Sequence, residues 1–219
     1  LQATSLQTGL GDFRLPLLIS SRTGYQNLCR LITKMKLRSK KDEGAVFEQE
    51  LEQHSQGLIC LTGGDDGPFA HALRTGGFEA ARKSVEHLAH IFGKHNVYVE
   101  LQRHYRREQE LRNRAAAKIA RYLDLPLLAT NGVRYATPEA RELADVFTAL
   151  RSHCTMNTAG RMLTRNSECH LKSPGEMQKL FADLPEAIAN TVELSSRLEF
   201  TLEDLGYEFP KYPVPEGES

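Results

Sequence analysis

The residues best suited to chemistry stand where short apolar segments of the chain end. Carboxylate and imidazole groups at such places can hold a divalent metal ion, as they do in metal-dependent hydrolases. Three candidate residues carry such a group, namely Asp65, Glu100 and His104, and they are far apart in the sequence. Two further polar residues complete the candidate set, which is Asp65, Glu100, His104, Asn131 and Arg134.

Each candidate ligand also has a simpler interpretation. Asp65 and Asp66 stand in a glycine-rich segment. Although a carboxylate pair can bind a divalent ion, Asp-Gly sequences more often form turns and cap the next helix. His104 has few neighbours that could complete a metal site, so a hydrogen-bonding role is favoured. The chain has no Ser-His-Asp set, P-loop or dinucleotide-binding glycine motif.

Basic residues form a second candidate group. Arg103, Arg106 and Arg107 lie next to a predicted helix at 108–122 that carries four more cations. Such a cluster is a candidate for contact with the phosphates of a nucleic acid. The basic run at 34–41 ends another predicted helix, where cations are favoured in any case, so we interpret it as a solvated helix end.

Four apolar segments, at 15–20, 58–62, 97–101 and 127–130, are predicted to be buried strands. At least one predicted helix follows each strand, which is typical of a parallel sheet or an α/β barrel. The carboxyl ends of the strands carry the functional residues in such folds. Helices are predicted near 23–35, 45–54, 68–74, 78–92, 108–122, 138–150, 174–181 and 185–198.

Periodicity predicts which side chains share the apolar face of a helix. The inward face of the helix at 108–122 is expected to comprise Leu111, Ala115, Ile119 and Tyr122. The apolar stripe of the helix at 138–150 is expected to comprise Leu143, Val146, Phe147 and Leu150. Residues 1–14 give no periodic signal and are expected to be an irregular lead-in.

Composition narrows the class of protein. The 28 basic and 28 acidic residues cancel, so no global field attracts nucleic acid or membranes. No apolar run is long enough for a transmembrane helix, and no signal peptide is evident. The four cysteines are far apart, which suits a reducing cytoplasm and disfavours a thiolate zinc site. Cys29 and Cys60 lie in apolar contexts and are expected to be core residues.

Six segments together are similar to one protein family. They are GYQNL at 24–28, GLICLTGG at 57–64, VELQRH at 99–104, ATNGVRY at 129–135, LFADLPEA at 180–187 and DLGYEFP at 204–210. This set resembles the amino-terminal PHP (polymerase and histidinol phosphatase) domain of bacterial C-family DNA polymerases, the type of the DNA polymerase III alpha subunit. The sequences ELQRH at 100–104 and NGVR at 131–134 are most similar to those of the error-prone, damage-tolerant branch.

The resemblance implies a distorted seven-stranded (β/α)7 barrel, of which the four predicted strands would be the last four. The chain would then hold an incomplete α/β barrel without the amino-terminal part, whose strands would carry a His-x-His. Residues 1–200 would be the carboxyl-side portion of the PHP domain. Residues 201–219 would be an extended linker toward a palm domain that the chain does not include.

The resemblance also implies where metal ligands would stand. A cysteine ligand would be replaced by Gly64, and an aspartate and a histidine by Gly132 and Arg134. Glycine has no side chain to donate, and a protonated guanidinium has no lone pair. We therefore expect no metal and no catalytic residue in this segment, which would be a scaffold. Arg134 is expected to form an ion pair with Glu100 in place of the metal charge.

The alternative is an active metal-dependent phosphoesterase or 3′–5′ exonuclease that recruits Asp65, Glu100 and His104 as ligands. In either case the resemblance implies a parent DNA-directed DNA polymerase, a cytoplasmic nucleotidyltransferase that uses Mg²⁺, DNA and dNTPs. Its expected roles are error-prone translesion synthesis, DNA repair and replication, with other replication and repair proteins as further partners. No membrane association is expected.

Overall fold

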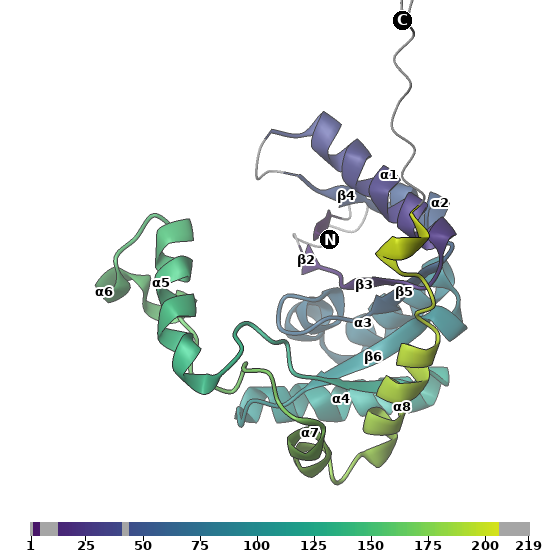
Figure 1. Cartoon of the computed structure of the whole chain (residues 1–219). Helices are drawn as coiled ribbons and strands as arrows, with labels where there is room; N and C mark the ends of the chain where they lie inside the picture. Colours follow the sequence, from purple (N-terminus) through teal and green to yellow (C-terminus); the bar gives the residue numbers. More distant parts are fainter. Residues whose placement is uncertain (1, 5–12, 41–43, 206–219) are drawn as a thin grey trace, which may run out of the picture.

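A four-stranded sheet forms the centre of the computed structural model, which describes residues 2–4, 13–40 and 44–205 (Figure 1). The strand order is β3 (Leu17–Ile19), β5 (Leu58–Leu61), β6 (Val97–Gln102) and β7 (Leu127–Thr130). β5, β6 and β7 are parallel, whereas β3 pairs antiparallel with β5. All four predicted strands are confirmed. The sheet is open, as expected of a partial PHP-type α/β fold.

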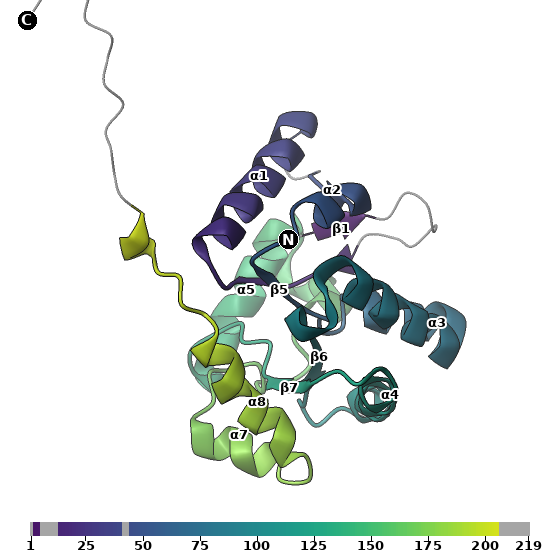
Figure 2. The same cartoon turned by 90° about the vertical axis from the view of Figure 1, so that its right-hand side faces the viewer.

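Helices cover the two faces of this sheet unequally. The larger apolar core contains side chains of α1 (Arg22–Arg38), α3 (Pro68–Phe92) and α4 (Arg107–Leu123). A smaller cluster on the opposite face includes Leu194 of α8 (Pro185–Ser196). Figure 2 shows α3 and α4 on one side of the strands and α8 on the other. Burial on both faces explains why these strands read as continuous apolar runs.

A close backbone approach joins α1 to the entrance of β5. Ser21 is the N-cap of α1, and its side chain accepts a hydrogen bond from the backbone N–H of Gly24. The carbonyl of Gly57 lies directly over Gly24, and a Cβ atom on Gly24 would lie 1.8 Å from that oxygen. Gly57 itself has a φ of +75°. Only glycine leaves room for this contact.

The first residues of the chain also contribute regular structure. β1 (Gln2–Thr4), β2 (Phe13–Arg14) and β4 (Val46–Phe47) form a second, three-stranded sheet. The expectation of an irregular lead-in is therefore wrong for β1 and β2, and Val46–Phe47 form a strand instead of the start of the predicted helix at 45–54. Their pairing partners are distant in sequence, so local periodicity gives no sign of them. α2 (Glu48–Gln53) follows β4 within the predicted helix at 45–54.

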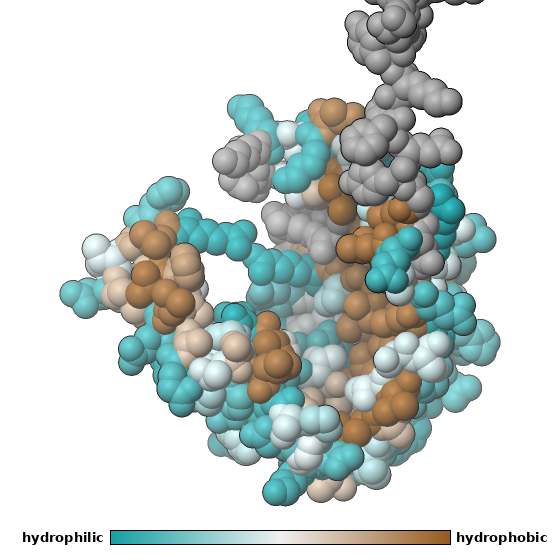
Figure 3. All heavy atoms as spheres, viewed as in Figure 1, coloured by the Kyte–Doolittle hydropathy of each residue, from teal (hydrophilic) through white to brown (hydrophobic). Residues whose placement is uncertain are grey.

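An arm extends from the body after β7. It consists of η2 (Pro138–Ala140), α5 (Arg141–Arg151), α6 (Met156–Ala159) and η3 (Gly160–Met162), and Figure 1 shows it apart from the sheet. The apolar stripe of α5 is exposed to solvent, with Leu150 63% exposed. Figure 3 shows apolar side chains on the arm. Amphipathic periodicity found this helix but did not reveal that its apolar face is uncovered.

The remaining elements agree with most of the predicted boundaries. α3 contains a non-helical residue at Gly77, which confirms the predicted break between two helices. α7 (Pro174–Leu180) begins with the predicted capping box at Ser173. η4 (Leu202–Asp204) lies in the predicted linker, of which 206–219 is outside the described residues.

Three inward-facing assignments are wrong. Leu111 and Tyr122 of α4 are 59% and 71% exposed, because the buried face of that helix is rotated toward Ala116 and Ile119. Cys29 is exposed, whereas Cys60 is buried as expected, and all four cysteines are free thiols. Within the described residues, no helix combines the length and apolar character that crossing a membrane requires.

Candidate functional site

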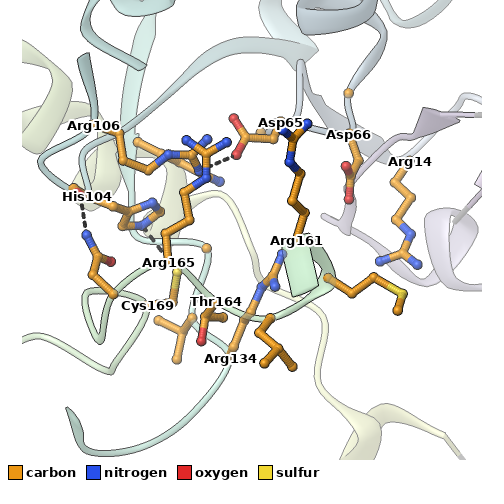
Figure 4. Close-up of a pocket in the computed structure, with 18 of the residues that line it drawn as sticks. Arg14, Asp65, Asp66, His104, Arg106, Arg134, Arg161, Thr164, Arg165 and Cys169 are labelled. Atoms are coloured by element: carbon orange, nitrogen blue, oxygen red, sulfur yellow. Dashed lines mark hydrogen bonds and ion pairs between the residues drawn. The ribbon is translucent and has the colours of Figure 1, made fainter. Parts of the chain in front are cut away.

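A cavity of about 690 Å³ lies at the carboxyl ends of β5, β6 and β7, between the body and the arm. Figure 4 shows its charged side chains, which come from elements distant in sequence. Five arginines and two aspartates line it, so its lining carries a net positive charge. A positive cavity disfavours the entry of a divalent cation. These residues are Arg14, Arg106, Arg134, Arg161, Arg165, Asp65 and Asp66.

The side chain of Gln102 fills the space between two glycines at the base of the cavity. A Cβ atom on Gly64 would lie 2.8 Å from the Gln102 Oε1 atom. A Cβ atom on Gly132 would lie 3.0 Å from the Gln102 Nε2 atom, and Gly132 has a φ of +50°. A side chain at either position would require the terminal amide of Gln102, the end of a flexible side chain, to shift. The glycines and the glutamine therefore form one packed unit.

Asp65 is held by two arginines. Arg106 Nη1 donates to Asp65 Oδ2 at 2.8 Å, and the Arg112 guanidinium binds the other carboxylate oxygen. Burial alone would raise the pKa of the Asp65 carboxyl, but the two guanidinium groups outweigh it and hold the pKa below its ordinary value. Because two guanidinium groups already bind this one carboxylate, Asp65 is poorly suited to bind a metal ion as well.

Glu100 lies below the cavity and is only 7% exposed. Its Oε1 atom accepts hydrogen bonds from the Gln102 amide, at 2.8 Å, and from the Thr130 hydroxyl. The expected ion pair with Arg134 is wrong, since the described residues place no basic side chain on Glu100. Arg134 instead lies in the segment that leads from β7 to the arm. Its backbone N–H donates to the carbonyl of Cys169 at 2.8 Å.

His104 is buried, and both of its ring nitrogens have partners. The backbone N–H of His104 donates to Gln109 Oε1 at 2.8 Å, which leaves the Gln109 amide nitrogen to donate to His104 Nδ1 at 2.8 Å. His104 Nε2 then donates to the carbonyl of Asn131 at 2.9 Å. These contacts select the neutral imidazole that is protonated on Nε2. Burial lowers the pKa of His104.

This arrangement predicts a pH dependence of stability. The unfolded chain takes up a proton on His104 near pH 6.5, whereas the folded chain does so only at lower pH. Stability is therefore complete above about pH 6.5 and is lost as the pH falls toward the folded-state pKa. Chemical denaturation at several pH values should show the free energy of unfolding decreasing less for His104→Asn than for the wild type over this window. Equal decreases would contradict the assignment.

Asn131 joins the end of β7 to the returning arm. Its side-chain amide donates to the carbonyls of Glu168 and His170, at 2.9 and 2.6 Å. Neither Asn131 nor Glu100 lines the cavity, whereas Asp65, His104 and Arg134 do. The five predicted residues therefore gather at one end of the sheet without pointing into a common space. Within the described chain, no group of three or more His, Cys, Asp or Glu residues is arranged to hold a metal ion.

The three predicted nucleic-acid contacts have different environments. The Arg103 guanidinium binds the Asp183 carboxylate and the carbonyl of Leu180, at 2.9 and 2.7 Å. It thereby joins the loop before α4 to the end of α7. Arg106 is occupied by Asp65, as described above. Arg107 is exposed, and it has no ion pair among the described residues.

Sequence reasoning missed the residues that fill the site. Gln102 and Gln109 were not predicted, because a glutamine carries no signal that separates a buried partner from a surface residue. Arg161 and Arg165 reach the cavity from the arm, and no local pattern indicates that the arm folds back. Cys169 lies 3.8 Å from His104 through its Sγ atom and was likewise missed.

Comparisons with known proteins identify relatives. Residues 4–104 match the model of the PHP domain family. The chain is 34% identical over 202 residues, 92% of its length, to DNA polymerase III subunit alpha of Vibrio cholerae. It is 36% identical over 201 residues, 90% of its length, to the error-prone DNA polymerase of Brucella abortus. It spans only 17% and 18% of these two relatives.

Proposed function

We propose that this chain, which belongs to the PHP domains of DNA polymerase III alpha subunits and error-prone DNA polymerases, is a non-catalytic scaffold. The observation that carries this proposal is the packing of Gln102 against Gly64 and Gly132. The resemblance places metal ligands at both glycine positions. In this chain, a glutamine amide occupies the space that those ligands would need.

The other groups near the cavity support the same conclusion. A metal ion would need free carboxylate oxygens or imidazole lone pairs. Asp65 is bound by two arginines, and both ring nitrogens of His104 are engaged. Glu100 is hydrogen-bonded through Oε1 to Gln102 and Thr130 beneath the cavity, and its buried Oε2, which has no hydrogen-bond partner among the described residues, is a single carboxylate oxygen without a second ligand beside it. The residues present therefore do not fit a divalent metal, and we assign no hydrolytic step to them.

The activity of the parent protein is a second part of the proposal. The names of the relatives support a DNA polymerase as the parent protein. We propose that the parent acts on DNA and dNTPs, with Mg²⁺ held outside this segment. The residue forms at 100–104 and 131–134 favour the error-prone branch, with translesion synthesis and repair in the cytoplasm. Identities of 34% and 36% to the two kinds of relative do not separate the branches.

A metal measurement tests the scaffold role. The chain should be incubated with Zn²⁺ or Mn²⁺, desalted and examined by elemental mass spectrometry, together with His104→Ala. We expect far less than one ion per chain in both proteins, and no change in the melting temperature of the wild type with EDTA. Stoichiometric metal in the wild type that is lost in His104→Ala would instead establish the alternative phosphoesterase site.

A further inference from the structure

The solvent-facing side of α4 carries a row of cations. Arg107, Arg114, Lys118 and Arg121 are all exposed and recur at spacings of seven, four and three residues. At 3.6 residues per turn, these four residues lie within about 60° of arc on the helix surface. The buried residues Asn113, Ala116 and Ala120 define the opposite side of the helix. The four cations therefore point away from the body in one direction.

None of these four cations is neutralised within the described part of the chain, where they have neither ion pairs nor side-chain hydrogen bonds. The neighbouring arginines behave differently. Arg103 and Arg112 face the body and bind Asp183 and Asp65. The same sequence region thus contains an inner set of structural arginines and an outer set of free cations.

An ordinary solvated helix face would mix charges of both signs. α3 provides the example, since Arg82 binds Glu79 and Glu86 at spacings of three and four residues. Such pairs stabilise an exposed helix. The same side of α4 carries Glu110, three residues after Arg107 and four before Arg114, but Glu110 pairs with Arg103 instead of with either of them. Like charges at these spacings repel each other, and a bound polyanion would offset that repulsion.

We infer that this row, defined as Arg107, Arg114, Lys118 and Arg121, binds the phosphate backbone of a nucleic acid. The row is about 21 Å long at 1.5 Å per residue, which matches about six phosphates of one strand at 3.4 Å per step. A straight helix with guanidinium and ammonium groups on one side can follow one strand without reading its bases. The inference goes beyond the scaffold role and does not depend on the absence of a metal.

The experiment compares two double variants of the full chain with the same change in charge. Arg114→Glu/Lys118→Glu reverses the centre of the row, and Lys34→Glu/Lys36→Glu reverses two exposed cations of α1. Fluorescence anisotropy would measure binding to single-stranded and duplex DNA of about 30 nucleotides, between about 50 and 200 mM salt. The four positions are exposed, so thermal melting should show that both variants remain folded. Arg114→Gln/Lys118→Gln serves as a neutral version.

We expect the reversal in the row to weaken binding by at least about 30-fold at low salt, while the α1 variant stays within about threefold of the wild type. The neutral version should reduce the slope of log K against log salt by about 1.4 to 1.8. The strand form that binds more tightly at the same salt concentration identifies the preferred source of phosphate. Equal losses in both charge-reversed variants, no binding by the wild type at low salt, or equally tight binding of polyglutamate would each overturn the inference.

Discussion

Replacing Gly24 by alanine is expected to lower the free energy of unfolding by more than about 4 kcal/mol, a large share of the roughly 5–15 kcal/mol that stabilises a typical domain. The added Cβ atom would lie 1.8 Å from the carbonyl oxygen of Gly57 and 2.5 Å from its carbonyl carbon. Both neighbours are backbone atoms, so no side-chain rotation can relieve the overlap. Either α1 or the start of β5 must move.

Local hydrogen bonds resist that movement. The Gly57 carbonyl accepts from the backbone N–H and the hydroxyl of Ser20, both at 3.0 Å. The α1 N-cap at Ser21 bonds to Gly24 itself. Shifting either backbone would therefore break contacts that position the end of β3 against β5, and the penalty would spread through the sheet.

Gly175→Ala is the matched control for this prediction. No heavy atom lies within 4 Å of a Cβ atom at Gly175, which is a helical residue of α7. Alanine there should raise stability by about 0.5 to 1 kcal/mol, because glycine weakens helices. Urea denaturation followed by circular dichroism would compare the two variants. A Gly24→Ala protein within about 1 kcal/mol of the wild type would show that the backbone contact is not tight.

The strands could be predicted because burial on both faces requires a continuous run of apolar residues in the sequence. β5 and β6 are covered on both faces, so Leu58–Leu61 and the first five residues of Val97–Gln102 are all buried. A short apolar run bounded by turn residues favours a buried strand, because a buried helix would be longer. β1, β2 and β4 could not be predicted in this way, because strands of two or three residues are too short to show a run or an alternation of apolar residues.

The candidate site could be located from the sequence but not assembled from it. The strand ends correctly indicated where Asp65, His104 and Arg134 lie, because the carboxyl ends of parallel strands share one edge. The expected Arg134–Glu100 pair is not formed, because Glu100 is buried beneath the cavity, where Gln102 and Thr130 donate to its Oε1, whereas Arg134 lines the cavity itself. Which polar group reaches a buried partner depends on distances that sequence spacing does not contain.

The inner and outer arginines of α4 make the same point. Arg114 and Asp65-bound Arg112 are only two residues apart, but their side chains point in directions that differ by about 200° around the helix axis. By composition alone the region is one basic cluster. In the structure, some of its cations face the body and others face solvent. Arg103, Arg106 and Arg112 stabilise the body, and the outer row remains available to an external anion.

Replacing Gln109 by leucine is expected to cost about 2 to 5 kcal/mol of stability, although the two side chains have similar volumes. Gln109 is 1% exposed and supplies partners to the backbone N–H and the Nδ1 atom of His104. Leucine would leave both groups buried and unpaired. Urea denaturation near pH 7.5 should therefore show a loss far beyond that of an exposed substitution such as Gln26→Leu.

A second variant, Gln109→Glu, tests whether Gln109 sets the protonation state of His104. A carboxylate can still accept from the His104 backbone N–H, while its second oxygen faces Nδ1. That oxygen accepts only from an Nδ1–H, while the bond to the Asn131 carbonyl needs an Nε2–H, so only the imidazolium keeps both bonds and the pKa of His104 should rise above its unfolded value. The resulting stability is present below about pH 6.5 and is lost as the pH rises through the folded-state pKa, opposite to the wild type. Denaturation at about pH 5.5 and 7.5 would reveal this reversal. A Gln109→Glu protein that still gains stability with increasing pH would show that Gln109 does not set the protonation state of His104.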